Sequence, residues 1–525
     1  MSRSFFVSSP GSRGPHAIFR FMIFKRVKPL ERLLADSGGQ IPAPETAPAA
    51  IAPGAPITGA TLKRSLGAGS LTAMGIGAII GTGIFVLTGV AAATRAGPSL
   101  TISFIVAGLV SAFAALCYAE VASRVPIAGS AYTFAYASLG ELLAWIIGWD
   151  LVLEYALGAS TVSIGWSGYF ATLLKNALHI NIPAALSSSH WTVGAGGSVT
   201  AGPGIVNLPA FCIIILIGIL LYRGTRESAL FNNIVVTIKV AIVLFFIILG
   251  VGHVNQGNWI PYFPFGVTGM LGGAAFIFFA YIGFDAVSTA AEETKNPKRD
   301  LPIGIIGSLA ICTVLYIIVV AILTGIVPYT KLNVPQPVAF AMDSVRMGWA
   351  STIISLGAIA GLTTVLLVMM FGQVRVFFAI ARDGLLPPVF GRVHPRFRTP
   401  GTSTIIFTIF IALLAAFTPI GIVGALTNMG TLVAFILVSI ALPIIRARYP
   451  GREGFSVPFG PYVIPVLAAV SAAFLIWSLQ YGSPLWFGVP APWFGFIVWT
   501  IAGLVIYGLY GRRHSTVGAE EATAA

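Results

Sequence analysis

The chain has 525 residues, of which 57% are hydrophobic and only 9% are charged, and its formal charge at neutral pH is +13. Soluble domains carry about a quarter charged residues, so this composition excludes a soluble multidomain enzyme and also fibrous and disulfide-rich classes. In a soluble protein the positive charge would suggest nucleic-acid binding, but here it indicates basic loops on one side of a membrane. We expect one unit embedded in the lipid bilayer, with no nucleic-acid ligand and no obligate protein partner.

The first 65 residues differ in composition from the rest of the chain. Residues 1–21 are rich in Ser, Gly and Pro, and we expect a weakly structured extension before the more regular segment that begins at Met22. Residues 41–57 form a Pro/Ala linker. The stretch is too polar for a signal peptide. We therefore expect residues 1–65 to form a cytoplasmic tail.

From Leu66 onward, apolar runs long enough to cross about 30 Å of hydrocarbon recur between short polar breaks. They predict an all-α membrane protein with about twelve transmembrane helices. The expected spans are 68–93, 99–120, 131–172, 206–222, 228–250, 268–290, 302–327, 351–381, 402–418, 425–445, 461–480 and 492–510. The third run is too long for one perpendicular crossing, so residues 131–140 form an interfacial lead-in or the helix is strongly tilted.

The basic residues predict how the helices are oriented. With the N-terminus inside, 25 of the 30 Lys and Arg residues fall on the cytoplasmic side. The outer side receives only Arg95, Lys175, Lys331 and Arg346, and Lys239 is embedded in a span. Because cytoplasmic loops are enriched in basic residues, both termini of this multi-pass protein are predicted to be cytoplasmic. The expected outer loops contain no Asn-x-Ser/Thr glycosylation acceptor, which fits a bacterial inner membrane.

The first span contains the segment GIGAIIGTGIF, in which Gly75, Gly77, Gly81 and Gly83 weaken the helix. Unwinding near residues 79–83 would leave the amides of Gly81, Thr82 and Gly83 at a half-helix N-terminus, which suits a carboxylate. Freed carbonyls near Ile79 would suit an ammonium group. The alternative is helix packing through the GxxxG pair of Gly77 and Gly81. Spacing alone leaves both interpretations open.

The sixth span places Gly283 beside the ionisable Asp285 in the segment FFAYIGFDA. An intramembrane carboxylate is costly unless it has a partner, so a second discontinuity is expected here. Spans one and six begin two five-helix halves, and interrupted helices at corresponding positions indicate a midplane binding site in an inverted-repeat transporter.

Four further ionisable residues lie within the apolar runs. Lys239 lies about two turns into span five, where burial would disfavour its charged form and allow it to alternate between charged and neutral forms in proton coupling. The alternative is a lysine that snorkels to the interface. Asp150 and Glu154, with Glu141 before them, are expected to partner basic or hydroxyl groups in a structural role. Cys117, Cys212 and Cys312 lie in apolar runs without pairing or metal spacing, so we interpret them as core residues.

These motifs resemble the amino acid–polyamine–organocation superfamily, and within it the cationic amino acid transporter family and its bacterial homologues. The matching segments are GIGAIIGTGIFVLTG (75–89), VPIAGSAYTFAYASLGELLAWIIGW (125–149), FFAYIGFDAVSTAAEETKNPKRDLPIGI (278–305) and GQVRVFFAIARDGLLP (372–387). The resemblance covers roughly residues 24–512, apart from the linker.

The resemblance implies the fold of the sodium-coupled leucine transporters. Repeat one would span residues 66–250, repeat two 268–445, and two peripheral helices 461–510, before a cytoplasmic tail at 511–525. The substrate carboxylate would meet the amides of Gly81, Thr82 and Gly83. The substrate amino group would meet the carbonyls of Ile79 and Ile282.

The resemblance also assigns the remaining site residues. Phe279 would cover the substrate, Ala280 would lie beside it, and Asp285 would hold the break or face the pocket. Lys239 matches a lysine that replaces a sodium ion in proton-coupled relatives.

The expected function is import of a small neutral or cationic amino acid by alternating access, coupled to a proton and needing no other cofactor and no metal. An exchanger or an uncoupled facilitator is the alternative, with a channel-like pore and a non-transporting scaffold as further rivals. Because nucleophile, metal and phosphate-binding motifs are missing from the sequence, an enzyme is not expected.

Overall fold

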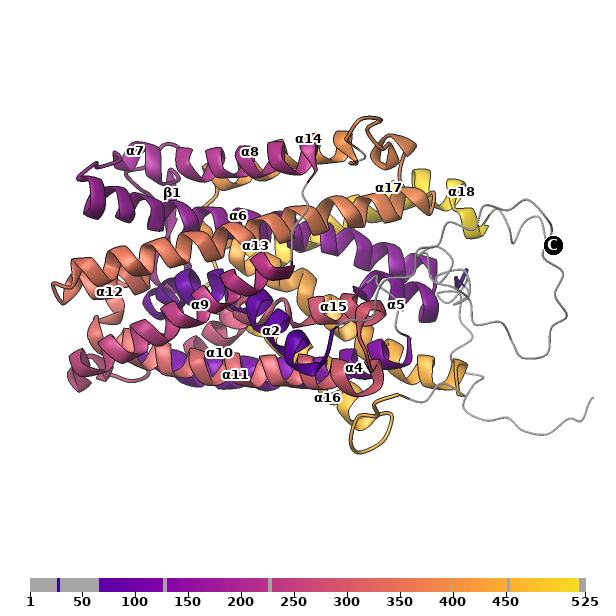
Figure 1. Ribbon diagram of the computed structural model, residues 1–525, viewed down its shortest axis with the longest axis horizontal. Coiled ribbons are helices and arrows are strands. Elements are labelled where there is room, and N and C mark those ends of the chain that lie inside the picture. The colour runs from indigo at the N-terminus through magenta and orange to yellow at the C-terminus, as the bar shows by residue number, and fades with distance from the viewer. Residues whose placement is uncertain are drawn as a thin grey trace, which may run out of the picture.

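The computed structural model describes residues 26–28, 66–125, 130–224, 229–397, 399–450 and 454–518. The expected extension at 1–21 and the Pro/Ala linker at 41–57 lie outside these residues. Figure 1 shows an elongated helical bundle, with the helices running along its long axis.

Helices make up most of the described chain. The longer ones are α2 (Ala68–Ile79), α4 (Leu100–Arg124), α5 (Ser130–Ser138), α6 (Glu141–Leu178), α8 (Leu208–Arg223), α9 (Ala229–Gly250), α10 (Gly266–Ile277), α11 (Pro297–Ile326), α13 (Gly348–Arg382), α14 (Gly401–Phe417), α15 (Ile420–Arg448), α16 (Val463–Ser478) and α17 (Ala491–Ile506). Among the described residues, eight stretches are long and apolar enough to cross a membrane, and three shorter apolar helices accompany them.

Short elements connect these helices. They include η3 (Gly83–Leu87), α3 (Thr88–Ala91), η4 (Ala92–Ala96), α7 (Ala184–Ser187), η9 (Phe278–Tyr281), η10 (Phe284–Glu293), α12 (Pro337–Ser344), η13 (Tyr507–Gly511) and α18 (Arg512–His514). Two small antiparallel hairpins pair β1 (Trp191–Val193) with β2 (Val199–Ala201), and β3 (Leu485–Trp486) with β4 (Val489–Pro490).

The two ends of the bundle differ. The hairpin end carries α7, β1 and α12, whereas the tail end carries α5 and α18 (Figure 1). Residues 26–28 and 512–518 also lie at the tail end, where Arg26 donates to the carbonyl of Arg512. The N-terminal and C-terminal segments described therefore share one end, as the distribution of basic residues predicts.

The structure decides two expectations about local structure. The third apolar run has a separate lead-in at 131–140 and is not one tilted helix, because α5 and α6 are separate and Gly140 between them adopts φ 95°, which favours glycine. Of the three cysteines, Cys117 and Cys312 are buried but Cys212 is exposed on α8.

The core is formed by α6 packed along α13, and by α11 packed along α2 and α4. Interior side chains are overwhelmingly apolar, and aliphatic residues pack there with aromatic ones such as Phe104, Tyr118 and Phe435. Residues 79–87 of the first broken segment and residues 272–282 of the second are buried inside this core.

Candidate functional site

The first break separates α2 from η3. Ile80 leaves the helix with extended angles (φ −72°, ψ 102°), and helical structure resumes at Thr82. The GxxxG alternative is also partly realised, because a Cβ at Gly77 would lie 2.3 Å from Cγ2 of Val236 on α9. Gly77 thus permits close packing of α9, while the chain unwinds one turn later at Ile80 and Gly81.

The second break separates α10 from η10. After the tight turn of η9, Ile282 is extended (φ −60°, ψ 135°) and Gly283 adopts φ 118°, a conformation that other residues rarely take. Asp285 lies in the first turn of η10, where the amide of Ala286 donates to the carbonyl of Gly283 at 3.1 Å. The role of Asp285 at this break stays a prediction.

The two breaks lie directly against each other. A Cβ at Gly83 would come within 2.2 Å of Cα of Ala280, and a Cβ at Gly283 would come within 2.7 Å of the carbonyl oxygen of Ala78. Since real Cβ atoms do not approach other atoms this closely, both contacts require glycine. The segments on which the sequence places a binding site are thus brought together.

The predicted site residues are enclosed. Ile79, Thr82, Phe279, Ala280 and Ile282 are buried. Gly81 and Gly83 are buried as well, whereas Asp285 is only partly buried. Unwound backbone at membrane depth is tolerated where it is shielded by protein or lines a cavity, and this location meets that condition.

Three polar side chains that the sequence did not single out support the breaks. Tyr316 of α11 donates its hydroxyl to the carbonyl of Ile79 at 2.8 Å. Asn428 of α15 donates to the carbonyls of Ala275 and Phe276, the last turn of α10, at 2.9 and 2.7 Å. Tyr281 donates to the carbonyl of Phe104 at 2.8 Å. The available signal was a polar group inside an apolar run, since such groups commonly bond across helices.

Two buried polar atoms at the breaks have no hydrogen-bond partner among the described residues. They are Oγ1 of Thr82, whose residue is 1% exposed, and Oδ1 of Asn428, whose residue is fully buried. An unpaired buried polar atom is unfavourable by about 1–3 kcal/mol. A group that offers a hydrogen-bond donor would satisfy either oxygen.

Lys239 is 2% exposed and does not snorkel. Its ammonium group donates to the carbonyl of Gly77 at 2.9 Å. Its aliphatic stem lies close to Gly361, because a Cβ added at Gly361 would lie 3.0 Å from Cγ of Lys239. The snorkelling alternative is therefore wrong in this structure. Lys239 connects α9 to the part of α2 that precedes the first break.

The three carboxylates of the third apolar run differ in their surroundings. Glu141 accepts from several hydroxyl and guanidinium groups. Glu154 is buried, with 5% of its surface exposed. Asp150 is 1% exposed, and neither of its oxygens has a hydrogen-bond partner in the described ranges. The expected basic or hydroxyl partner is thus wrong for Asp150.

A cavity of about 120 Å³ lies at the hairpin end. Its wall includes Val90 of α3, Ile164 of α6 and Trp191 of β1. Val90 follows the first break, so this cavity lies on the hairpin side of the two apposed breaks.

Comparison with known proteins places these features in a family. Residues 66–507 match the family model described as amino acid permease. The chain is 50% identical over 456 residues to the methylthioribose transporter of Bacillus subtilis, covering 87% of this chain and 95% of the relative. It is also 50% identical over 457 residues to the branched-chain amino acid permease BcaP of the same organism, covering 87% and 94%.

A plant relative is more distant. The vacuolar cationic amino acid transporter 4 of Arabidopsis thaliana is 40% identical over 392 residues, which cover 73% of this chain and 64% of the relative. The family match spans both broken segments and the helices that enclose them. The chain belongs to the amino acid permease family of the amino acid–polyamine–organocation superfamily.

Proposed function

We propose that this chain is a secondary active transporter that imports a small neutral or cationic amino acid together with a proton. The observation that carries the proposal is the direct apposition of the two helix breaks, Gly83 against Ala280 and Gly283 against Ala78. Paired breaks in corresponding helices of two halves are typical of midplane sites in inverted-repeat transporters.

The proposed site recognises the groups that all amino acids share. The substrate carboxylate binds the amides of Gly81, Thr82 and Gly83 at the start of the second half of span one, where the helix dipole favours an anion. The ammonium group binds the carbonyls of Ile79 and Ile282. The Ile79 carbonyl already accepts from Tyr316, but a carbonyl oxygen has two lone pairs and accepts a second donor.

Side chains then define the rest of the pocket. Phe279 covers the substrate and Ala280 lies beside it, while Asp285 holds the break in span six. The relatives named as a methylthioribose transporter, a branched-chain permease and a cationic transporter differ in the cargo that their names state. For this reason the proposal covers both neutral and cationic amino acids.

The proton is assigned to Lys239. When charged, its ammonium donates to the Gly77 carbonyl and ties α9 to the first half of span one. Loss of the proton removes the charge and frees α2 to move. A proton that enters from outside and leaves inward would thereby couple its gradient to the movement of α2.

The fold proposed for this cycle has twelve transmembrane helices in two inverted five-helix repeats, 66–250 and 268–445, followed by two peripheral helices. The tail end faces the cytoplasm of a bacterial cell, because the predicted cytoplasmic basic residues include Arg446, Arg448 and Arg512 near it. The broken helices move relative to the remaining scaffold.

Uptake into proteoliposomes tests the proposal. Radiolabelled valine, isoleucine, lysine and arginine are offered separately, with methylthioribose beside them and with or without an inward proton gradient. We expect accumulation of at least one amino acid above the external concentration only when the gradient is present. Equal uptake in both conditions would refute the coupling.

An exchanger is the alternative from the same family. Its signature would be uptake that depends on amino acid preloaded inside the vesicles and is indifferent to the proton gradient. Ohmic single-channel current in planar bilayers would instead identify a pore.

A further inference from the structure

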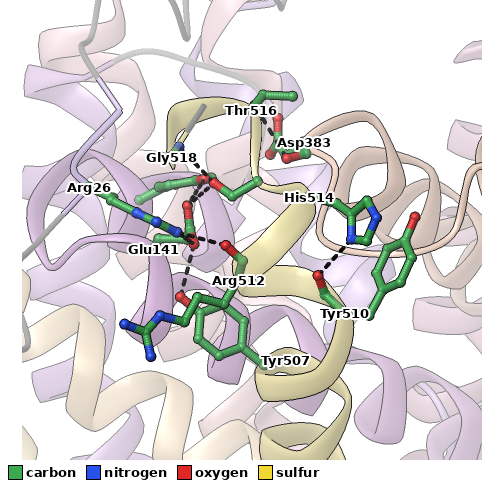
Figure 2. A network of polar contacts seen from close by, with 11 residues as sticks. Arg26, Glu141, Asp383, Tyr507, Tyr510, Arg512, His514, Thr516 and Gly518 are labelled. Carbon is green, nitrogen blue, oxygen red and sulfur yellow. Dashed lines mark hydrogen bonds and ion pairs between the residues drawn. The ribbon is translucent and has the colours of Figure 1, made fainter. Parts of the chain in front are cut away.

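A polar network closes the tail end of the bundle, and Figure 2 shows it from close by. Its first centre is Glu141, the first residue of α6, which is 1% exposed. One carboxylate oxygen accepts from Arg26 at 3.1 Å and from the hydroxyl of Tyr507 at 2.8 Å. The other accepts from the hydroxyls of Ser515 and, at 3.3 Å, Tyr136. Four segments of the chain therefore meet at one carboxylate.

The second centre is Asp383, immediately after α13. Its carboxylate pairs with Lys28 at 2.8 Å and accepts from the hydroxyl of Tyr132 at 2.7 Å. Its backbone carbonyl accepts from the amide of Thr516 at 3.2 Å and from the Thr516 hydroxyl at 3.3 Å. The same C-terminal segment thus contacts the ends of both α6 and α13.

Within residues 512–518, Arg512, Arg513 and His514 are exposed, whereas the part from Ser515 to Gly518 packs against the bundle. Ser515 and Val517 are 2% and 5% exposed. A Cβ at Gly384 would lie 2.2 Å from the carbonyl oxygen of His514, and a Cβ at Gly518 would lie 2.5 Å from the guanidinium carbon of Arg26. The Ser515 hydroxyl also accepts from the amide of Gly518 at 3.0 Å, which fixes the turn that places it.

The network is connected to the second helix break through α5. Tyr132 and Tyr136, which donate to the two acids, both belong to α5, and the amide of Lys28 donates to the carbonyl of Tyr136 at 3.2 Å. α5 in turn packs against η10, the segment that follows the break at Gly283. The chain of contacts from η10 through α5 thus reaches Glu141 and Asp383 at the ends of α6 and α13.

We propose that residues 512–518 form a latch, in which Ser515 and Thr516 join the tail ends of α6 and α13 at Glu141 and Asp383, the two acids that also hold α5, and keep this end of the transporter closed. This inference rests on the proposed alternating-access function. The contacts are hydroxyl and amide hydrogen bonds, which water replaces when the segment leaves, so the latch can release and re-form in each cycle. Its strength sets how often the tail end opens.

Hydrogen–deuterium exchange of the full-length chain in lipid nanodiscs tests the latch without any substrate. The test variant Ser515→Asp places a second carboxylate against Glu141, and Ser515→Ala removes the hydroxyl alone. The matched control is Arg392→Ala, because Arg392 is exposed and lies outside residues 512–518 and outside the contacts described above. Exchange is compared in α5, in η10 and in the β1–β2 hairpin at the opposite end.

In Ser515→Asp we expect amide exchange in α5 and η10 to rise at least about tenfold, with the hairpin and the control variant unchanged. A rise confined to residues 512–518 would overturn the proposal, since the segment would then be a passive cover. If Ser515→Asp also speeds exchange in the hairpin, the added charge has destabilised the whole bundle, and Ser515→Ala becomes the deciding variant. Faster exchange in α5 and η10 supports the latch, and unchanged exchange there overturns it.

Failure of the latch and failure of transport give different results. The exchange experiment reports opening of the tail end in the absence of amino acid and gradient. Proteoliposome uptake by the unmodified chain reports transport alone. Unchanged exchange in the variants together with intact uptake by the unmodified chain would refute only the latch. Absent uptake by the unmodified chain would refute the proposed function.

Discussion

The tail end and the apposed breaks each contain a buried lysine, and the two lysines have different hydrogen-bond acceptors. Lys28 and Lys239 are each 2% exposed. Lys28 faces a carboxylate, Asp383, at 2.8 Å, in a network where the acids accept several hydrogen bonds. Lys239 faces the neutral carbonyl of Gly77. Lys28 therefore lies in an ion pair, whereas the ammonium group of Lys239 bonds a neutral acceptor.

The same contrast holds for the oxygen atoms that accept hydrogen bonds. At the tail end, Glu141 and Asp383 use both carboxylate oxygens in hydrogen bonds. At the breaks, Thr82 and Asn428 each keep a buried oxygen without a partner among the described residues. A fully bonded network specifies one geometry, while an incompletely bonded site gains free energy when a ligand completes it. We interpret the tail end as structural closure and the breaks as the binding site.

The largest effect is expected from Lys239→Ala, which removes the buried ammonium group near the breaks. Without the ammonium group nothing links the proton to the movement of α2, so uphill accumulation in proteoliposomes is expected to be lost entirely. Radiolabelled uptake with and without an inward proton gradient measures this. The matched control is Lys295→Ala, which removes an exposed lysine and should accumulate normally. Unchanged uphill transport in Lys239→Ala would remove Lys239 from the mechanism.

Gly83→Ala tests the apposition of the breaks. Its new methyl group would lie 2.2 Å from Cα of Ala280, so the backbone must shift. Overpacking is unfavourable by about 1–3 kcal/mol, which corresponds to roughly a 5- to 150-fold loss of apparent substrate affinity. Gly69→Ala is the control, because no heavy atom lies within 4 Å of its Cβ position. Equal substrate affinity in both variants would show that the close contact between Gly83 and Ala280 is not needed for binding.

Asn428→Ala tests whether Asn428 only stabilises the end of α10 or also contributes to substrate binding. The substitution leaves the carbonyls of Ala275 and Phe276 without their donor and also removes the unpaired Oδ1. We expect the melting temperature to fall by about 2–4 °C, and transport to fall by about tenfold. Thr427→Val, which loses only a bond within its own helix, serves as the control. Reduced stability with unchanged transport would limit Asn428 to a structural role.

The smallest effect is expected from Thr82→Val. The Thr82 hydroxyl has no partner among the described residues, so its removal should leave the melting temperature within about 1 °C. If that hydroxyl faces the substrate, KM should rise a few-fold while kcat is retained. An unchanged KM would show that only the backbone at Thr82 is relevant.

Much of the site could be predicted from the sequence because its signals are local. Four glycines between residues 75 and 83 indicate one break, and Gly283 beside Asp285 indicates the other. Both breaks lie where they were expected, and Lys239 was recognisable as a charge within an apolar run. Their assignment to substrate and proton remains a prediction.

The supporting residues could not be predicted, because they act across long sequence separations. Tyr316 meets Ile79 over 237 residues, and Ser515 meets Glu141 over 374. A tyrosine or serine is compatible with many environments, and nothing near it in sequence specifies its acceptor. The packed C-terminal segment was likewise expected only as a cytoplasmic tail, since its short polar sequence gives no periodic signal.

Thermal shift of the purified chain tests most directly whether the apposed breaks bind an amino acid, because a ligand that binds the native state stabilises it by mass action. Amino acids are compared with their methyl esters, which lack the carboxylate, and with methylthioribose, on the unmodified chain and on Gly83→Ala. We predict that at least one amino acid raises the melting temperature of the unmodified chain, and that its ester and the Gly83→Ala variant show no such rise. Equal stabilisation by the ester, or a full shift in Gly83→Ala, would contradict binding of the substrate carboxylate at the breaks.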